Sequence, residues 1–252
     1  MKSITIDGLT IGEGIPKVCV PIVGVSKDEI IEQTRNACAS ESDLVELRID
    51  YYDGCRNVNL VSELLECLTE YMTKPCIFTL RGKEEGGELA VTNQEYMDIL
   101  SVAMKNDIIQ FVDVELSRER DTFVKIIQKA HEHNKKVIVS SHDFTRTPKK
   151  EVLLEKLEQM ESLGADIAKI AVMPKDLNDV LILLDTTVLA KENLQIPIIT
   201  MSMGKLGAIS RAAGQIFGSC VTFGIAGKAS APGQIPATAL KKMMEEINKY
   251  CV

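Results

Sequence analysis

Short apolar runs alternate along this chain with longer stretches in which apolar residues recur at helical spacing. The short runs are rich in Val and Ile, as buried strands are, and they lie at 17–23, 44–50, 75–81, 109–115, 136–142, 166–172, 197–203 and 220–225. Helices are expected between them, near 59–72, 119–134, 175–192, 205–217 and 236–250, and after start signals at Ser26–Glu29, Thr92–Glu95 and Thr147–Pro148.

Strands that begin about 27–30 residues apart in a chain of 252 residues predict a (β/α)8 barrel. Alternating apolar residues flank the turn Asp7-Gly8, which predicts a hairpin over 3–14 ahead of the barrel. No linker or break in composition divides the chain, so we expect a single domain over 1–252. An open doubly wound sheet is the main alternative, but no GxGxxG turn follows the first strand.

The composition narrows the class of protein. Apolar residues make up 45% of the chain and charged residues 26%, which is typical of a soluble globular protein. The net charge of −7, without a Lys/Arg tract, argues against nucleic-acid binding. No apolar segment predicts a secretory signal or a membrane span. Seven cysteines without a CxxC pair favour reduced thiols in a cytosol over disulfides or a zinc site.

A lysine lies in the middle of one apolar strand. Because side chains alternate across a strand, Lys169 points away from the face of Ala168 and Ile170. Burial of an ammonium is costly and lowers the pKa of a lysine, which predicts a neutral amine. Such an amine attacks carbonyl groups and forms a Schiff base. The alternative is a lysine that reaches water at a strand end or pairs with an internal acid.

Other strands also carry polar residues near their C-terminal ends, where barrels place their active sites. Glu46, Arg48 and Asp50 alternate with apolar neighbours and would face the barrel mouth. The third strand ends at Arg81, and the fourth turns Asp113 towards the interior, where it could balance an arginine. A solvated edge strand would show the same alternation, but an internal strand could not bury these charges unpaired.

Two segments near the predicted mouth have alternative interpretations. His142 follows the fifth strand, and across the mouth from Lys169 it would serve as an acid or base, because its pKa lies near neutrality. A structural hydrogen-bonding role is the alternative. The segment 227–236 after the eighth strand contains Gly233 beside a proline, and it is either a lid or a plain connector.

Taken together, these segments resemble type I 3-dehydroquinate dehydratases. The match extends over essentially the whole chain, and its most specific parts are His142–Phe144, the strand lysine about 27 residues later and the loop Ser230–Gln234. The other matching segments are Glu46–Asp50, Thr79–Arg81, Glu85–Glu88, Met203–Gly204 and Ser210–Arg211. The resemblance implies a (β/α)8 TIM barrel with an N-terminal β-hairpin closing the barrel floor, in a homodimer that needs no metal or organic cofactor. The expected cytoplasmic location comes from the cysteines.

The same resemblance implies an activity: syn elimination of water from 3-dehydroquinate to 3-dehydroshikimate through a lysine Schiff base, the third step of the shikimate pathway. By similarity, Lys169 forms the imine, His142 transfers the proton and Glu85 holds the imidazole. Arg211 would bind the carboxylate of this anionic substrate. The other implied substrate contacts are Glu46, Arg48, Arg81, Met203, Phe223, Ser230 and Gln234.

Two other functions stay open from the residues themselves. A class I aldolase also forms an imine on a barrel lysine, and the segment 226–234 is compatible with the phosphate site of an enzyme acting on a sugar phosphate. A barrel that only binds or serves as a scaffold is the third hypothesis, but it gives no reason for a lysine inside a strand.

Overall fold

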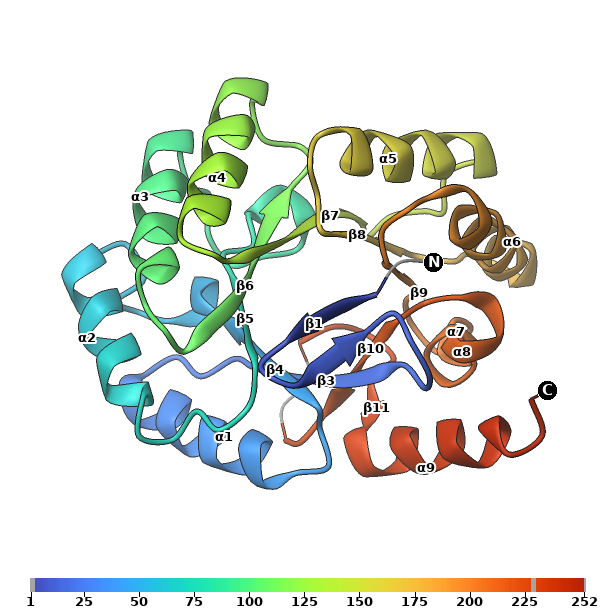
Figure 1. Cartoon of the computed structure of the whole chain (residues 1–252), viewed down its shortest axis with the longest axis horizontal. Coiled ribbons are helices and arrows are strands. Elements are labelled where there is room, and N and C mark those ends of the chain that lie inside the picture. Colours follow the sequence, from blue (N-terminus) through green and yellow to red (C-terminus); the bar gives the residue numbers. More distant parts are fainter. Residues whose placement is uncertain (1–2, 228–229, 252) are drawn as a thin grey trace.

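A parallel sheet forms the centre of the molecule, with helices arranged around it (Figure 1). The computed structural model describes residues 3–227 and 230–251. From β3 to β9, each strand of the barrel pairs with the next in chain order. These strands are β3 (Lys17–Ile22), β4 (Leu44–Arg48), β5 (Cys76–Thr79), β6 (Ile109–Glu115), β7 (Lys136–Asp143), β8 (Ile167–Val172), β9 (Ile198–Ser202) and β10 (Val221–Ile225).

The sheet closes on itself. β10 pairs in parallel with β3, the first strand of the series. On the other side, β9 meets the start of β10 through a bridge between Ile198 and Ser219, and the Cys220 N–H donates to the Ile198 carbonyl at 2.8 Å. The short strand β11 (Ile235–Pro236) pairs with the far end of β10. The predicted (β/α)8 barrel is confirmed.

The predicted hairpin is also confirmed. β1 (Ile4–Ile6) and β2 (Leu9–Ile11) pair antiparallel, and the turn residues Asp7 and Gly8 have positive φ angles of 48° and 79°, as such tight turns require. Figure 1 shows the hairpin crossing the middle of the barrel. Its apolar side chains pack against the core inside the barrel. Thr5 and Ile6 share a surface hollow with Lys136, the first residue of β7, so the hairpin covers the N-terminal end.

Helices cover the outer face of the barrel (Figure 1). They are α1 (Lys27–Ala39), α2 (Val58–Leu68), α3 (Asn93–Met104), α4 (Arg120–Glu132), α5 (Lys150–Ser162), α6 (Leu177–Asn193), α7 (Ala208–Ala212), α8 (Gly214–Phe217) and α9 (Ala237–Asn248). Two short 3-10 turns, η1 (Ile49–Tyr51) and η2 (Lys83–Glu85), follow β4 and β5. No helix in the described part of the chain is long and apolar enough to cross a membrane.

The helix starts and one of the helices differ in part from the prediction. Thr92 forms the expected capping box with Glu95 at the start of α3. Thr147 does not cap a helix, because its hydroxyl donates to the Met173 carbonyl and α5 begins only at Lys150. The single helix expected over 205–217 is interrupted at Ala213 and divides into α7 and α8.

The alternation of side chains along each strand supplies two separate cores. In β8, Ala168 and Ile170 belong to the core between strands and helices. Ile167 and Ala171 belong to the core inside the barrel. Lys169 lies between these two inward positions, so its side chain points into the barrel, as the sequence predicts.

Candidate active site

Lys169 lies inside the barrel and is only 3% exposed. Its Nζ is 3.2 Å from Asp113 Oδ2 and 3.4 Å from Glu46 Oε1. It also lies 4.6 Å from the centre of the Phe223 ring. The two carboxylates come from β6 and β4, so strands far apart in the sequence converge on this amine.

Lys169 has two buried carboxylates as partners. A buried amine is stabilised by ion pairs and hydrogen bonds to internal acids. Both acids are almost completely buried, at 3% exposure for Glu46 and 0% for Asp113, so solvent screens the pairs little. The structure therefore matches the alternative in which an internal acid pairs with Lys169.

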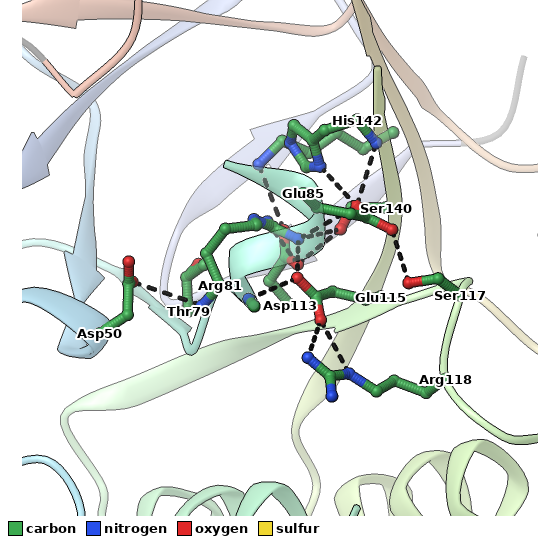
Figure 2. A network of polar contacts seen from close by, with 12 residues as sticks. Asp50, Thr79, Arg81, Glu85, Asp113, Glu115, Ser117, Arg118, Ser140 and His142 are labelled. Carbon is green, nitrogen blue, oxygen red and sulfur yellow. Dashed lines mark hydrogen bonds and ion pairs between the residues drawn. The ribbon is translucent and has the colours of Figure 1, made fainter. Parts of the chain in front are cut away.

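His142 forms a pair with Glu85. Oε2 of Glu85 accepts hydrogen bonds from the backbone N–H and from Nδ1 of His142, both at 3.0 Å. Figure 2 shows the carboxylate, carried by η2, reaching the imidazole at the end of β7. Because the carboxylate is the acceptor, Nδ1 carries the hydrogen and Nε2 of a neutral imidazole keeps its lone pair.

The surroundings keep this imidazole neutral. Burial lowers the pKa of His142 well below its usual value, and the nearby cations Arg81 and Lys169 lower it further. Burial raises the pKa of Glu85, although Arg81 partly opposes that effect. A neutral imidazole held by a carboxylate in this way is ready to accept a proton from a bound molecule.

Arg81 lies at the centre of a buried network (Figure 2). Its guanidinium contacts Asp113 Oδ1 at 2.7 Å, Ser140 Oγ at 2.9 Å and Glu115 Oε1 at 3.3 Å. Burial would raise the pKa of Asp113, but Arg81 and Lys169 together bring it below its usual value. The expectation that Asp113 balances an arginine is therefore confirmed. Arg81 faces the cavity with its charge already compensated.

The second arginine, Arg48, has one dominant partner. Its Nε and Nη2 each donate to the Asp50 carboxylate at 2.8 Å. Asp50 does not belong to the strand predicted over 44–50, because β4 ends at Arg48 and the chain turns into η1. The turn brings the carboxylate back alongside the guanidinium. It also lets Asp50 accept a hydrogen bond from the Glu88 N–H at 3.3 Å.

The third arginine, Arg211 on α7, has no carboxylate partner among the described residues. Its guanidinium donates to the carbonyls of Phe223 and Pro232, both at 3.3 Å, while the buried Nε has no partner within the described structure. Burial lowers its pKa to about 10. A 1% exposed guanidinium without a counter-charge is suited to binding an anion that enters the cavity.

The loop after β10 lies against this arginine. The Pro232 carbonyl accepts hydrogen bonds from Arg211 and from the Gly204 N–H at 3.1 Å. Gln234 Oε1 accepts from the Ser230 N–H at 2.8 Å, and its Nε2 donates to Ser230 Oγ at 3.1 Å. Part of the lid predicted over 227–236, namely 228–229, lies outside the described residues. Whether the loop opens as a lid stays a prediction.

One cavity at the C-terminal end of the barrel brings all the predicted site residues together. It encloses about 450 Å³ of empty space, counted out to its mouth. Its lining includes Glu46, Arg48, Arg81, Glu85, His142, Lys169, Met203, Arg211, Phe223, Ser230 and Gln234. In the described part of the chain, no group of three His, Cys, Asp or Glu side chains could hold a metal ion.

Known proteins are similar to this chain in sequence and in fold. Residues 18–250 match the family described as type I 3-dehydroquinase. The chain belongs to the type I 3-dehydroquinase family. It is 43% identical over 250 residues to a 3-dehydroquinate dehydratase of Clostridium novyi, covering 98% of this chain and 99% of that protein. A relative of the same name from Listeria welshimeri is 42% identical over 250 residues and covers 99% of both.

Solved structures of the type I 3-dehydroquinase family superimpose closely. The type I 3-dehydroquinate dehydratase from Clostridium difficile, with covalently modified comenic acid, has a TM-score of 0.96 at 39% identity over 99% of both chains. The 3-dehydroquinate dehydratase from Geobacillus kaustophilus also has a TM-score of 0.96, at 36% identity, over 100% of this chain and 98% of that one. The predicted family and enzyme class, a hydro-lyase, are thereby confirmed.

Several cavity residues of this type I 3-dehydroquinase were not predicted as site residues: Gly86, Phe144, Ala171, Met201 and Ala231. Ala171 could have been found, because it lies two residues after Lys169 on the same face of β8. The Phe144 ring packs directly against Gly86, so its position requires a glycine there. Gly86 has a φ of +81°, and the Phe144 ring occupies the space that a Cβ would need. Such a contact between distant segments leaves no mark in local sequence.

Proposed function

We propose that this chain dehydrates 3-dehydroquinate to 3-dehydroshikimate through an imine on Lys169. One observation carries the proposal: the same cavity is lined by an amine, a neutral imidazole and a buried guanidinium that has no counter-charge among the described residues. An amine supplies a covalent electron sink, an imidazole moves protons, and a guanidinium binds a carboxylate. The relatives named 3-dehydroquinate dehydratase support the same substrate for this chain.

The proposed role of Lys169 follows from the acidity of the substrate. A proton next to a ketone is weakly acidic. Condensation of the Lys169 amine with the ketone, whose oxygen leaves as water, gives an iminium that places a cation beside the carbanion that forms. The resulting enamine then expels the β-hydroxyl, and hydrolysis of the product iminium later frees the lysine. The carboxylates of Asp113 and Glu46, 3.2 and 3.4 Å from Nζ, would stabilise the positive charge of the iminium.

His142 is proposed to take the proton and then return it to the departing hydroxyl. A single imidazole on one face of the ring fits loss of both groups in the syn sense. Glu85, which accepts from Nδ1, would hold the ring and stabilise the imidazolium between the two transfers. Acid–base assistance of this kind typically contributes about 10²- to 10⁴-fold in rate.

Arg211 is proposed to bind the substrate carboxylate, since its guanidinium lacks a counter-charge among the described residues. Met203 and Phe223 would form the apolar walls of the ring site. The remaining proposed contacts to the carboxylate and ring hydroxyls are Glu46, Arg48, Arg81, Ser230 and Gln234, all of which line the cavity.

We also propose the finer features that the sequence and the family resemblance imply. These are a catalytic domain that extends over 1–252, a cytoplasmic location, a place at the third step of the shikimate pathway and a homodimer. Leu177 and Leu181 are 66% and 62% exposed on one face of α6, and such an apolar surface supports association with a second copy. Analytical ultracentrifugation tests the dimer.

Turnover of 3-dehydroquinate tests the proposed reaction directly. We expect the absorbance of a conjugated enone to grow when the protein meets 3-dehydroquinate, and we expect Lys169→Ala to fold normally without turnover. The aldolase alternative predicts cleavage of a sugar phosphate instead. Absence of enone growth in the wild-type protein would refute the proposed function.

A further inference from the structure

The two oxygens of the Glu85 carboxylate have different partners. Oε2 accepts from the backbone N–H and Nδ1 of His142 and lies 3.7 Å from Arg81 Nη1. Oε1 accepts from the hydroxyl of Ser117 at 2.7 Å. Figure 2 shows Ser117 approaching the carboxylate from the side opposite His142. Ser117 comes two residues after the end of β6, so it belongs neither to η2 nor to β7.

The turn that carries Ser117 is fixed on both sides. Before it, the Leu116 N–H donates to the Ser140 carbonyl at 2.8 Å. After it, the Arg118 guanidinium donates from Nε to Glu115 Oε2 at 2.8 Å and lies 4.2 Å above the Tyr96 ring. The hydroxyl is therefore presented to Glu85 by a fixed backbone, although Ser117 itself is exposed.

We propose that Ser117 is a positioning residue for the dehydration, one that holds the Glu85 carboxylate in the plane in which Oε2 meets His142 Nδ1. A carboxylate turns about its last carbon–carbon bond, and a donor on the far oxygen restricts that rotation. Arg81 cannot replace this donor readily, because it is already bound by Asp113 and Glu115. The inference rests on the proposed function, in which Glu85 serves His142.

The charged groups around Glu85 determine how the loss of the Ser117 hydroxyl would change the pKa of Glu85. They are Arg81 beside it, Asp113 and Glu115 on β6, and His142 on β7. Burial already raises the pKa of Glu85, and the hydrogen bond from Ser117 opposes that rise. Without the hydroxyl, Glu85 takes up a proton at higher pH and ceases to be the acceptor for Nδ1. The acidic limb of the pH–rate profile then moves upward.

The experiment compares Ser117→Ala with Ser117→Thr, which keeps the hydroxyl. For Ser117→Ala we expect kcat to fall about 3- to 10-fold with KM unchanged, because water at this exposed position replaces part of the hydrogen bond. We expect the acidic limb of kcat to shift to higher pH and Ser117→Thr to restore both values. Ser62→Ala is the matched control, since Ser62 donates to Glu66 on the outer helix α2, remote from the cavity.

Each outcome is decisive for the inference. Wild-type kcat and an unshifted pH profile in Ser117→Ala would overturn it, as would a lowered melting temperature accompanied by an unshifted profile, which indicates a structural role only. Failure of the wild-type protein to produce enone would remove the proposed function and this inference together. Normal wild-type turnover with an unaffected Ser117→Ala variant would remove this inference alone.

Discussion

Two buried arginines of the cavity differ in their counter-charges. This difference predicts that one of them stabilises the fold and that the other serves mainly to bind the substrate. Arg81 is compensated by Asp113 and Glu115 within the fold. Arg211 is equally buried, but its partners among the described residues are two backbone carbonyls and the Met201 sulfur. A buried charge without a counter-ion costs folding free energy, whereas removal of one member of a buried pair leaves the other uncompensated. The two positions should therefore respond in opposite ways to the same substitution.

We predict that Arg211→Met raises KM by about 30-fold or more while the free energy of unfolding stays unchanged or rises by up to about 2 kcal/mol. Arg81→Met is the matched control, because it should lower the free energy of unfolding by about 3–5 kcal/mol. Urea denaturation and steady-state kinetics measure the two quantities. A large loss of stability in Arg211→Met would show that its charge is compensated in the fold.

We predict that His142 makes stability depend on pH. Its pKa in the folded protein lies well below the unfolded value of about 6.5, so as pH falls through 6.5 the unfolded chain binds a proton that the folded protein does not. The wild-type protein should therefore lose about 1.4 kcal/mol relative to His142→Gln between pH 7.5 and pH 5.5. Urea unfolding of both proteins at several pH values measures this difference, and a constant difference would contradict a neutral buried imidazole.

Alternation along strands was sufficient to predict the inward direction of Lys169 and the pairing of Asp113 with an arginine. It could not predict which acids pair with Lys169, because these carboxylates come from β4 and β6 and their proximity is set by the closed barrel. Ser117 also escaped prediction. It lies in a turn, where no periodicity indicates the direction of a side chain.

At the scale of elements, the ends of the barrel strands were predicted to within two residues, because each strand is an apolar run with polar or turn residues on both sides. The errors occurred where side chains compete with the expected local structure. β4 ends at Arg48 because Asp50 turns back to pair with it. Thr147 bonds to the Met173 carbonyl instead of capping α5.

The loop over 230–236 is the element whose packing matters most for binding. Gly233 has a φ of +75°, and a Cβ there would lie 2.3 Å from the Gly204 carbonyl oxygen. We predict that Gly233→Ala displaces the loop from Gly204 and Arg211 and raises KM about 10-fold, at a stability cost of about 1–2 kcal/mol from the positive φ.

Gly14→Ala is a matched control for this prediction. Gly14 has a similar φ of +68°, but no atom of the described residues lies within 4 Å of a Cβ at that position. Its backbone cost should be comparable, about 1–2 kcal/mol, while KM should stay at the wild-type value. An equal KM for Gly233→Ala and the wild-type protein would mean that the docked loop contributes nothing to substrate binding.

The whole molecule carries a net charge of −7, yet its cavity gathers three arginines, a lysine and a histidine. The barrel makes this possible, because it brings the C-terminal ends of strands distant in sequence to one place. The repeat of strands and helices was enough to predict that architecture. Apart from the balance between Asp113 and an arginine, the pairing of charges within the cavity, such as that of Lys169 with Glu46, was not predictable, because it depends on register across the closed sheet.

Reductive trapping tests the central claim most directly. When borohydride is added to the protein with 3-dehydroquinate, we expect peptide mass spectrometry to locate a reduced covalent adduct on Lys169, and none in Lys169→Ala or without substrate. The His142→Ala variant should still form the adduct while elimination stalls. An adduct on a different lysine, or continued turnover by Lys169→Ala, would contradict the account.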